Sequence, residues 1–185
     1  YLAELATDAH EKAREKIAGF VNVKPEQIVF TKNATESLNL LSYAFLNASL
    51  KAKFDKTINP KLVLNPGDEI VISELEHHAN LVPWQELCSK IGTILKWIPI
   101  TDEGLLDYSK LDSVITNRTR IVSVSHMSNV LGSITDVEKI GAAARKVNAF
   151  FFLDACQSVP HMPVDFNKLK ADAIAWSGHK MLGPL

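Results

Sequence analysis

Short apolar runs alternate with helical patterns along nearly the whole chain, and this alternation constrains the fold more than any other feature. Apolar residues at helical spacing indicate helices, whereas short continuous apolar runs indicate strands buried on both faces. Strands separated by helices favour a three-layer α/β/α fold with a mostly parallel sheet. We expect helices over 1–20, from 34 onward, and over 81–91, 106–115 and 136–147; the expected strands are 27–30, 69–73, 94–98, 120–125, 150–153 and 173–176.

Two connections carry further signals. Asn33 and Glu36 have the spacing of a capping box and mark the start of the second helix. The lysine-rich stretch 51–61 contains Asn59-Pro60 and lies between a helix and the next turn. Such a composition is typical of a solvated surface loop, so we expect an exposed insertion there.

Composition and charge narrow the class of protein. A chain of 185 residues suits one domain with a real core, and 46% hydrophobic with 22% charged residues argues against disorder. No apolar run is long enough for a membrane span, and the net charge of −1 without a basic stripe argues against nucleic acid as a partner. Cys88 and Cys156 lack metal or redox spacing, which suggests a reducing compartment such as the cytoplasm. The chain begins at Tyr1 without a signal-peptide pattern and ends in an apparent loop, so we expect both ends to be cut.

Polar residues follow five of the expected strands or begin the helices after them. In parallel sheets, ligands bind beyond the carboxyl ends of the strands, where these connecting loops gather. We therefore expect a binding site at this edge of the sheet, formed by residues 33–36, 76–80, 126–129, 154–157 and 177–180.

Three side chains in these loops could hold an organic cofactor. Asp154 directly follows a buried strand, where a carboxylate needs a cation or several donors, although it could simply cap the next turn. Gln157 could donate to a phenolate oxygen or be ordinary surface. Lys180, at a desolvated strand mouth, could have a lowered pKa and form a Schiff base, whereas most lysines in loops are solvated.

The remaining candidates are also open to two interpretations. Ala34 and Thr35 lie in a first helical turn, whose free amides favour an anion, but Asn33 competes for those amides. His77 could stack on a cofactor ring and move protons; with His78 it could also suggest zinc, but no HExxH motif or cysteine pair accompanies them. Asn129 could bind substrate or occupy a turn.

The ordered set of motifs is more specific than any single residue. It resembles the class V aminotransferase family and, within it, is most similar to group II, SufS-like cysteine desulfurases over essentially the whole chain. The resemblance rests on Ala34-Thr35-Glu36, on Glu76-His77-His78-Ala79-Asn80 with Val82-Pro83-Trp84, on His126-Met127-Ser128-Asn129-Val130-Leu131-Gly132, on Asp154-Ala155-Cys156-Gln157 and on Ser177-Gly178-His179-Lys180.

The resemblance implies a fold type I large domain that binds pyridoxal 5'-phosphate. In that family pattern Lys180 would carry the cofactor and His77 would stack on its ring and move protons, so both would be catalytic. The other matched positions would bind cofactor or substrate: Asp154 the ring nitrogen, Gln157 the phenolate oxygen, Ala34, Thr35, Ser177 and His179 the phosphate, and Asn129 the substrate side. No metal is implied.

The implied reaction converts L-cysteine to L-alanine and leaves a persulfide on a catalytic cysteine. It would supply a sulfur-acceptor protein for iron–sulfur clusters or related cofactors, in a cytoplasmic homodimer. A selenocysteine lyase, an amino-acid epimerase and a non-catalytic cofactor-binding fragment are the alternatives.

Some features depart from the family pattern. The catalytic cysteine and the substrate-carboxylate arginine of the family lie beyond residue 185, so we expect residues 1–185 to be a partial large domain without the C-terminal small domain, and inactive alone. Neither Cys88 nor Cys156 matches the nucleophile, Ala34 stands where threonine or glycine is frequent, and 51–61 is longer than the usual connection. We also expect a gap in the sheet between 27–30 and 173–176, with unpaired edges that favour aggregation or partner swapping.

Overall fold

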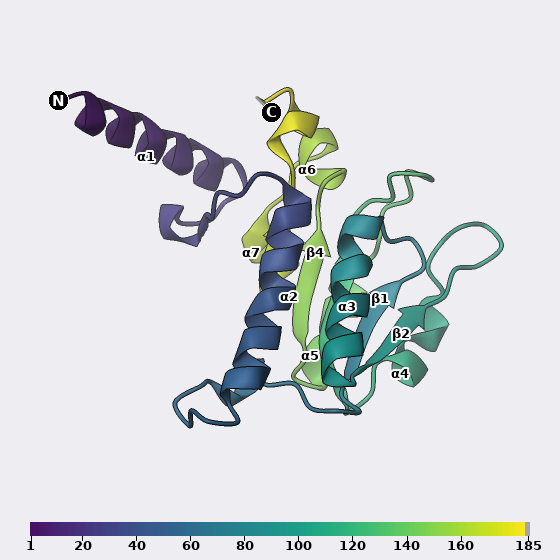
Figure 1. The fold of residues 1–185 in the computed structure, drawn as a ribbon. Coiled ribbons are helices and arrows are strands. Elements are labelled where there is room, and N and C mark those ends of the chain that lie inside the picture. Colours follow the sequence, from purple (N-terminus) through teal and green to yellow (C-terminus); the bar gives the residue numbers. More distant parts are fainter. Residues whose placement is uncertain (184–185) are drawn as a thin grey trace.

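The computed structural model describes residues 1–183, in which helices and strands alternate much as the sequence predicts (Figure 1). The helices are α1 Leu2–Phe20, α2 Ala34–Lys51, α3 Val82–Ile91, α4 Leu111–Val114, α5 Val137–Lys146, α6 Ser158–His161 and α7 Phe166–Leu169. The strands are β1 Glu69–Ser73, β2 Ile94–Ile98, β3 Thr119–Ser125, β4 Phe150–Asp154 and β5 Ala173–Ala175.

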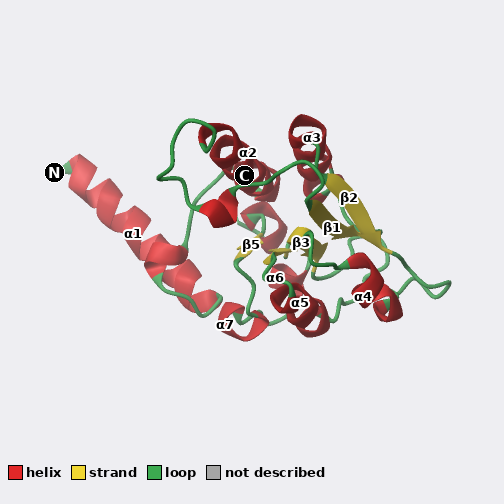
Figure 2. Ribbon diagram, turned by 90° about the horizontal axis from the view of Figure 1, so that it is seen from below, coloured by secondary structure: helices red, strands yellow, loops and turns green. Residues whose placement is uncertain are grey.

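The five strands form one parallel sheet in the order β2-β1-β3-β4-β5. Figure 2 shows its three layers: α2 and α3 lie on one side of the sheet, and α4, α5 and α7 lie on the other. The expected three-layer α/β/α arrangement is therefore confirmed. Helix α1 projects away from the sheet at the N-terminal end (Figure 1).

Side chains of the central strands alternate between two cores. Strand side chains on one face, such as Val71 and Phe151, pack with Ile140 and other residues of α5. On the opposite face, residues such as Ile72 pack with Trp84 of α3 and with α2. Because both faces are buried, each central strand is apolar throughout, which explains why the strands appear in the sequence as continuous apolar runs.

Two expectations about secondary structure are wrong or only partly met. Residues 27–30 are not a strand: Arg14 of α1 donates to the carbonyl oxygen of Ile28 at 2.5 Å, and Val29 and Phe30 are exposed. A side chain thus satisfies a backbone group that a strand ladder would have used. The expected helix 106–115 is a 3₁₀ turn, Tyr108–Lys110, followed by the single turn of α4.

The structure also bears on three further expectations: the surface insertion, the edges of the sheet and membrane-spanning segments. Within residues 51–61, most side chains are exposed, as expected of a surface insertion. Of the two expected unpaired edges only β5 is a strand, and it forms the edge of the sheet among the described residues. None of the helices described in residues 1–183 is long and apolar enough to cross a membrane.

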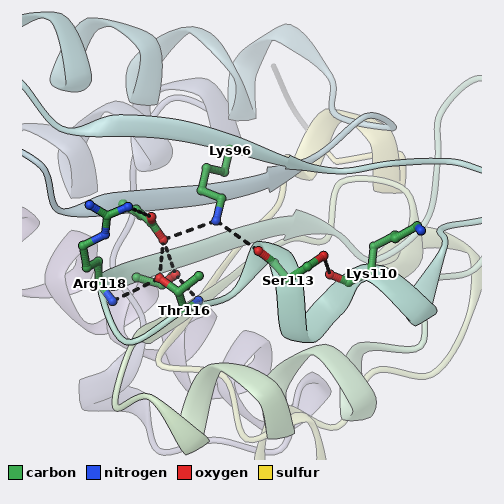
Figure 3. Close-up of polar contacts among 7 residues, drawn as sticks. Lys96, Lys110, Ser113, Thr116 and Arg118 are labelled. Carbon is green, nitrogen blue, oxygen red and sulfur yellow. Dashed lines mark hydrogen bonds and ion pairs between the residues drawn. The ribbon is translucent and has the colours of Figure 1, made fainter.

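A buried carboxylate joins β1, β2 and the loop before β3 at the amino-terminal edge of the sheet. Glu69, the first residue of β1, is 1% exposed. Its carboxylate accepts from the Thr116 hydroxyl at 2.6 Å and forms ion pairs with Arg118 at 3.0 Å and Lys96 at 3.5 Å. Figure 3 shows the side chains of Thr116, Arg118 and Lys96 in this cluster of polar contacts. Burial opposes ionisation, but the Thr116 hydroxyl and the two cations outweigh it, so the pKa of Glu69 is lowered.

We predict that Glu69→Gln lowers the free energy of unfolding by about 2 kcal/mol at pH 7, because it leaves two cations without their partner. The folded-state pKa of Glu69 lies below its unfolded-state value, so its stabilisation is present above the unfolded pKa and lost as pH falls through the folded one. Urea titrations from pH 7 down to acid should therefore show the gap between variant and wild type closing.

Glu86→Gln is the matched control, because Glu86 forms an exposed ion pair with Lys90 on α3. It should change the unfolding free energy little at any pH. A Glu69→Gln difference that stays constant into acid would show that the ion pairs at Glu69 do not supply the stability.

Candidate active site

A pocket of about 260 Å³ opens at the carboxyl-terminal edge of the sheet. It lies where the loops after β1, β3, β4 and β5 meet the N-terminus of α2. Every site residue predicted from the sequence lines it: Ala34, Thr35, His77, Asn129, Asp154, Gln157, Ser177, His179 and Lys180. Asn33, Ala79, Met127 and Cys156, which fall within the predicted loops, also line it, and Ser125 lines it although it lies outside those loops.

Asp154 is a buried carboxylate at the pocket wall. It is the last residue of β4, is 5% exposed and lies in register with Ser125 of β3 and Ala175 of β5. Its Oδ1 accepts the amide N–H of Cys156 at 2.9 Å. None of the ion pairs among residues 1–183 involves Asp154, so its negative charge is available to a cation in the pocket.

The first turn of α2 supplies donors to the same pocket. Asn33 caps the helix by accepting the amide of Glu36 at 3.0 Å, and Ser177 accepts the amide of Ala34 at 2.9 Å. The Thr35 amide belongs to the first turn, where no intrahelical acceptor exists. Capping and anion binding therefore do not exclude each other here: Thr35 and the Ser177 hydroxyl remain as donors.

His77 lies at the pocket and the neighbouring His78 does not. The Nδ1 atom of His77 accepts the Ala79 amide at 3.1 Å, which in the neutral ring places the proton on Nε2. The two rings are 6.3 Å apart and tilted. Among residues 1–183 no group of three or more histidine, cysteine or acidic side chains could hold a metal ion.

Lys180 differs from the expectation in its environment. It lies in the 3₁₀ turn Gly178–Met181 after β5, and both it and His179 are exposed. The structure thus puts the lysine at the pocket but not in the desolvated position that the sequence suggested. The chain direction after β5 explains this, since the turn carries Lys180 beyond the buried Ser177.

A buried polar network lies behind His77 and was not predicted. Glu76 accepts from Asn80 Nδ2 at 2.6 Å and from the amide and hydroxyl of Ser125 at 2.9 and 2.7 Å. The Asn80 carbonyl oxygen accepts from Trp84 Nε1 at 3.0 Å and from the Ser123 hydroxyl at 2.6 Å. The run Glu76–Asn80 was a usable signal, but its polar residues suggested ligand contacts rather than contacts with one another.

Neither cysteine has the properties of an activated nucleophile. Both are free thiols. Burial, reinforced by the charge of Asp154, raises the pKa of Cys156 to about 12, and burial raises the pKa of Cys88 within α3. This agrees with the expectation that neither matches the catalytic cysteine.

Comparisons with known proteins agree with this geometry. A family model described as aminotransferase class-V matches residues 1–185. The probable cysteine desulfurase 2 of Mycobacterium leprae is 49% identical over 183 residues, covering 99% of this chain and 41% of that protein. Two solved structures have TM-scores of 0.85. The apo cysteine desulfurase of Thermococcus onnurineus NA1 is 42% identical, and the match covers 100% of this chain and 42% of the chain in that structure. The CsdA cysteine desulfurase of Escherichia coli, as its S-sulfonic acid, is 34% identical, and the match covers 98% of this chain and 42% of the chain in that structure.

A parallel sheet with a polar pocket at its carboxyl edge defines an α/β protein with a ligand site at the strand ends. More particularly, the chain belongs to the class V aminotransferase family. The fold type I class expected from the sequence is confirmed by the same structural matches. The chain spans about two fifths of the length of the relatives named above.

We predict that alkylation of Cys156 by iodoacetamide speeds up about tenfold per pH unit from pH 7 to 9, without levelling off. The reason is that a thiol whose pKa is raised to about 12 stays protonated throughout this range. Peptide mass spectrometry would follow the rate, with glutathione as the reference thiol that does level off. A plateau below pH 9 at Cys156 would contradict the buried-thiol assignment.

Proposed function

We propose that the protein is a pyridoxal-phosphate-dependent cysteine desulfurase, which converts L-cysteine to L-alanine and transfers the sulfur to an enzyme thiol as a persulfide. The observation that carries the proposal is one pocket lined by Asp154, a buried carboxylate that forms no ion pair within residues 1–183, and by an amine, Lys180. The relatives, named cysteine desulfurases, favour this reaction over a selenocysteine lyase or an epimerase.

The donor set fits the cofactor group by group. Its pyridinium nitrogen is a cation, which suits the buried carboxylate of Asp154. Its phosphate is an anion, which suits the Thr35 amide and hydroxyl in the first turn of α2 together with Ser177 and His179, which follow β5. The Ala34 amide already donates to Ser177, so Ala34 would contact the phosphate only if that bond is shared or exchanged.

The remaining residues have roles that follow from their places in the pocket. Lys180 would hold the cofactor covalently and move protons at Nζ. His77 would lie against the ring and hold a proton at Nε2, since its Nδ1 is engaged by the Ala79 amide. Gln157 would donate to the phenolate oxygen and Asn129 would orient substrate. When bound, the cofactor supplies an electron sink that weakens bonds next to the substrate amine.

The sulfur step needs a thiol from outside this pocket wall. The enzyme thiolate attacks the sulfur of the substrate cysteine, and the C–S bond breaks with its electron pair left on the substrate Cβ. The sulfur stays on the enzyme cysteine as a persulfide, and Cβ takes up a proton to become the methyl group of alanine. The raised pKa of Cys156 makes it a poor thiolate source, and burial has the same effect on Cys88. We therefore place the accepting cysteine elsewhere in the protein.

The wider proposal concerns the protein beyond this domain. We assign residues 1–185 to part of the cofactor-binding large domain of a homodimer, and the Glu76–Asn80 and 128–132 motifs support group II. The persulfide would pass to an acceptor protein for iron–sulfur clusters or other sulfur cofactors. The two free cysteines support the cytoplasm as its compartment.

We predict that the protein, mixed with pyridoxal phosphate and freed of excess, shows a visible absorbance band that borohydride removes, with the added mass mapped to Lys180. Lys180→Ala should lose both the band and the label. Lys168→Ala is the control, because this exposed lysine of α7 lies outside the pocket. A band that persists in Lys180→Ala, or a label on another lysine, would contradict the assignment.

We also predict that Cys88→Ala and Cys156→Ala each keep most of the alanine formation from L-cysteine. Neither thiol ionises readily, so neither accepts the sulfur. Alanine and sulfide should be measured together in the full protein, because loss of the cysteine that accepts the sulfur would abolish the formation of both products. A fall of about a thousandfold or more in either variant would make that cysteine the persulfide carrier.

A further inference from the structure

Glu76 accepts more hydrogen bonds than any role in the proposed reaction requires. Its carboxylate receives the Ser73 hydroxyl, the Asn80 amide at 2.6 Å, and the Ser125 amide and hydroxyl at 2.9 and 2.7 Å. These donors come from the end of β1, from the turn that follows it and from the end of β3. One carboxylate thus joins two neighbouring strand ends and the loop between β1 and α3.

The residues that Glu76 holds are the direct neighbours of the pocket residues. Glu76 precedes His77 in the chain, and Asn80, bonded to Glu76, donates its amide to the His77 carbonyl at 2.8 Å. Ser125 itself lines the pocket and lies in register with Asp154. The two sides of the pocket that carry His77 and Asp154 therefore both rest on this carboxylate.

Asn80 extends the support into the core. It is 0% exposed, and its side chain bonds Glu76, Trp84 and Ser123 at the same time. An amide placed between a carboxylate and two donors has only one orientation that satisfies all three, with its nitrogen toward Glu76. Asn80 ends the turn that follows His77, so this single orientation holds the far end of that turn in place.

The charge state of Glu76 matters to this arrangement. An ionised carboxylate only accepts, which matches four donors, and no ion pair within residues 1–183 involves Glu76. Burial raises its pKa to about 7, against the lowering effect of these hydrogen bonds. Holding a carboxylate here without a partner cation costs free energy. A carboxylate present despite this cost has a positional role, because an apolar side chain could not accept these hydrogen bonds.

We propose that Glu76 is a positioning residue, which orients His77 and the strand end beside Asp154 through its four hydrogen bonds. This deepens the proposed function, since His77 and Asp154 are the residues assigned to the cofactor ring. The orientation itself is a property of the protein without the cofactor, so it can be measured separately.

The test compares acylation of His77 and His78 by diethyl pyrocarbonate in the intact, cofactor-free protein. Both histidines are exposed, but His77 Nδ1 is engaged by the Ala79 amide. Glu76→Gln replaces one acceptor by a donor, loosens the turn and frees this nitrogen. We expect the His77:His78 rate ratio, read by tandem mass spectrometry, to rise roughly fivefold, the change that corresponds to losing one ordinary hydrogen bond.

Two further variants keep the test decisive. Ser125→Ala removes one donor from β3, far from His77 in sequence, and should raise the ratio in the same direction even if Glu76→Gln does not fold. Glu86→Gln, on the exposed face of α3, should leave it unchanged. An unchanged ratio in the folded Glu76 and Ser125 variants, or an equal rise in Glu86→Gln, would overturn the proposal.

A second measurement separates this proposal from the proposed function. In the cofactor-loaded protein, Glu76→Gln should lower kcat about tenfold with KM within about twofold, because misorientation affects the reacting groups more than substrate binding. If the protein does not bind pyridoxal phosphate at Lys180, the proposed function fails while the acylation ratio still reports on Glu76. If the ratio does not move, the positioning role fails whatever the cofactor result.

Discussion

Burial of the sheet on both faces is the constraint on which the rest of this structure depends. Central strands such as β3 and β4 are apolar on both sides, so helices cover both sides, and the crossovers that supply these helices join strands that run in the same direction. The polar groups that form the pocket therefore lie mainly at the edge where the strands end. The pocket forms at the carboxyl edge because four strand ends and the start of α2 meet there.

The two edges hold carboxylates in opposite ways, a buried one at Glu69 in β1 and a half-buried one at Glu76 in the turn after it. Glu69 at the amino edge is paired with Lys96 and Arg118, and its pKa is lowered. Glu76 at the carboxyl edge is held by neutral donors, and its pKa is raised to about 7. The first arrangement stabilises the ionised form through charge, whereas the second holds the carboxylate through hydrogen bonds from neutral groups, without an ion pair among residues 1–183.

How far the sequence predicts this molecule depends on whether a feature is set locally or by a distant partner. The central strands and the cap at Asn33 are set by local pattern, and they were predicted. Every predicted site residue reached one pocket, because parallel strands bring their following loops together. Whether 27–30 forms a strand depends instead on Arg14, whose contact with the Ile28 carbonyl has no local signature.

The same distinction explains what was missed at the site. The exposure of Lys180 depends on the direction of a turn after β5, and the role of Glu76 depends on Ser125, which is distant in the sequence. A motif shows which residues belong together but not whether they contact a ligand or one another. Asn80 illustrates this, since its amide and carbonyl are both used within the protein.

The raised pKa of Glu76 has a consequence for stability that distinguishes a positioning group from a stabilising one. A carboxyl whose pKa is raised in the folded state, from 4.5 to about 7, contributes stability below its unfolded pKa that is lost as pH rises through the folded one. The difference amounts to roughly 3 kcal/mol between pH 4 and pH 8. Glu69 has the opposite sign, since its lowered pKa favours the fold above its unfolded pKa. Near neutral pH the fold therefore gains from the ionised carboxylate at the structural edge and bears a cost for the one behind the pocket. Such a cost is tolerated where a fixed acceptor must aim neighbouring side chains, which is the arrangement found at His77 and Ser125.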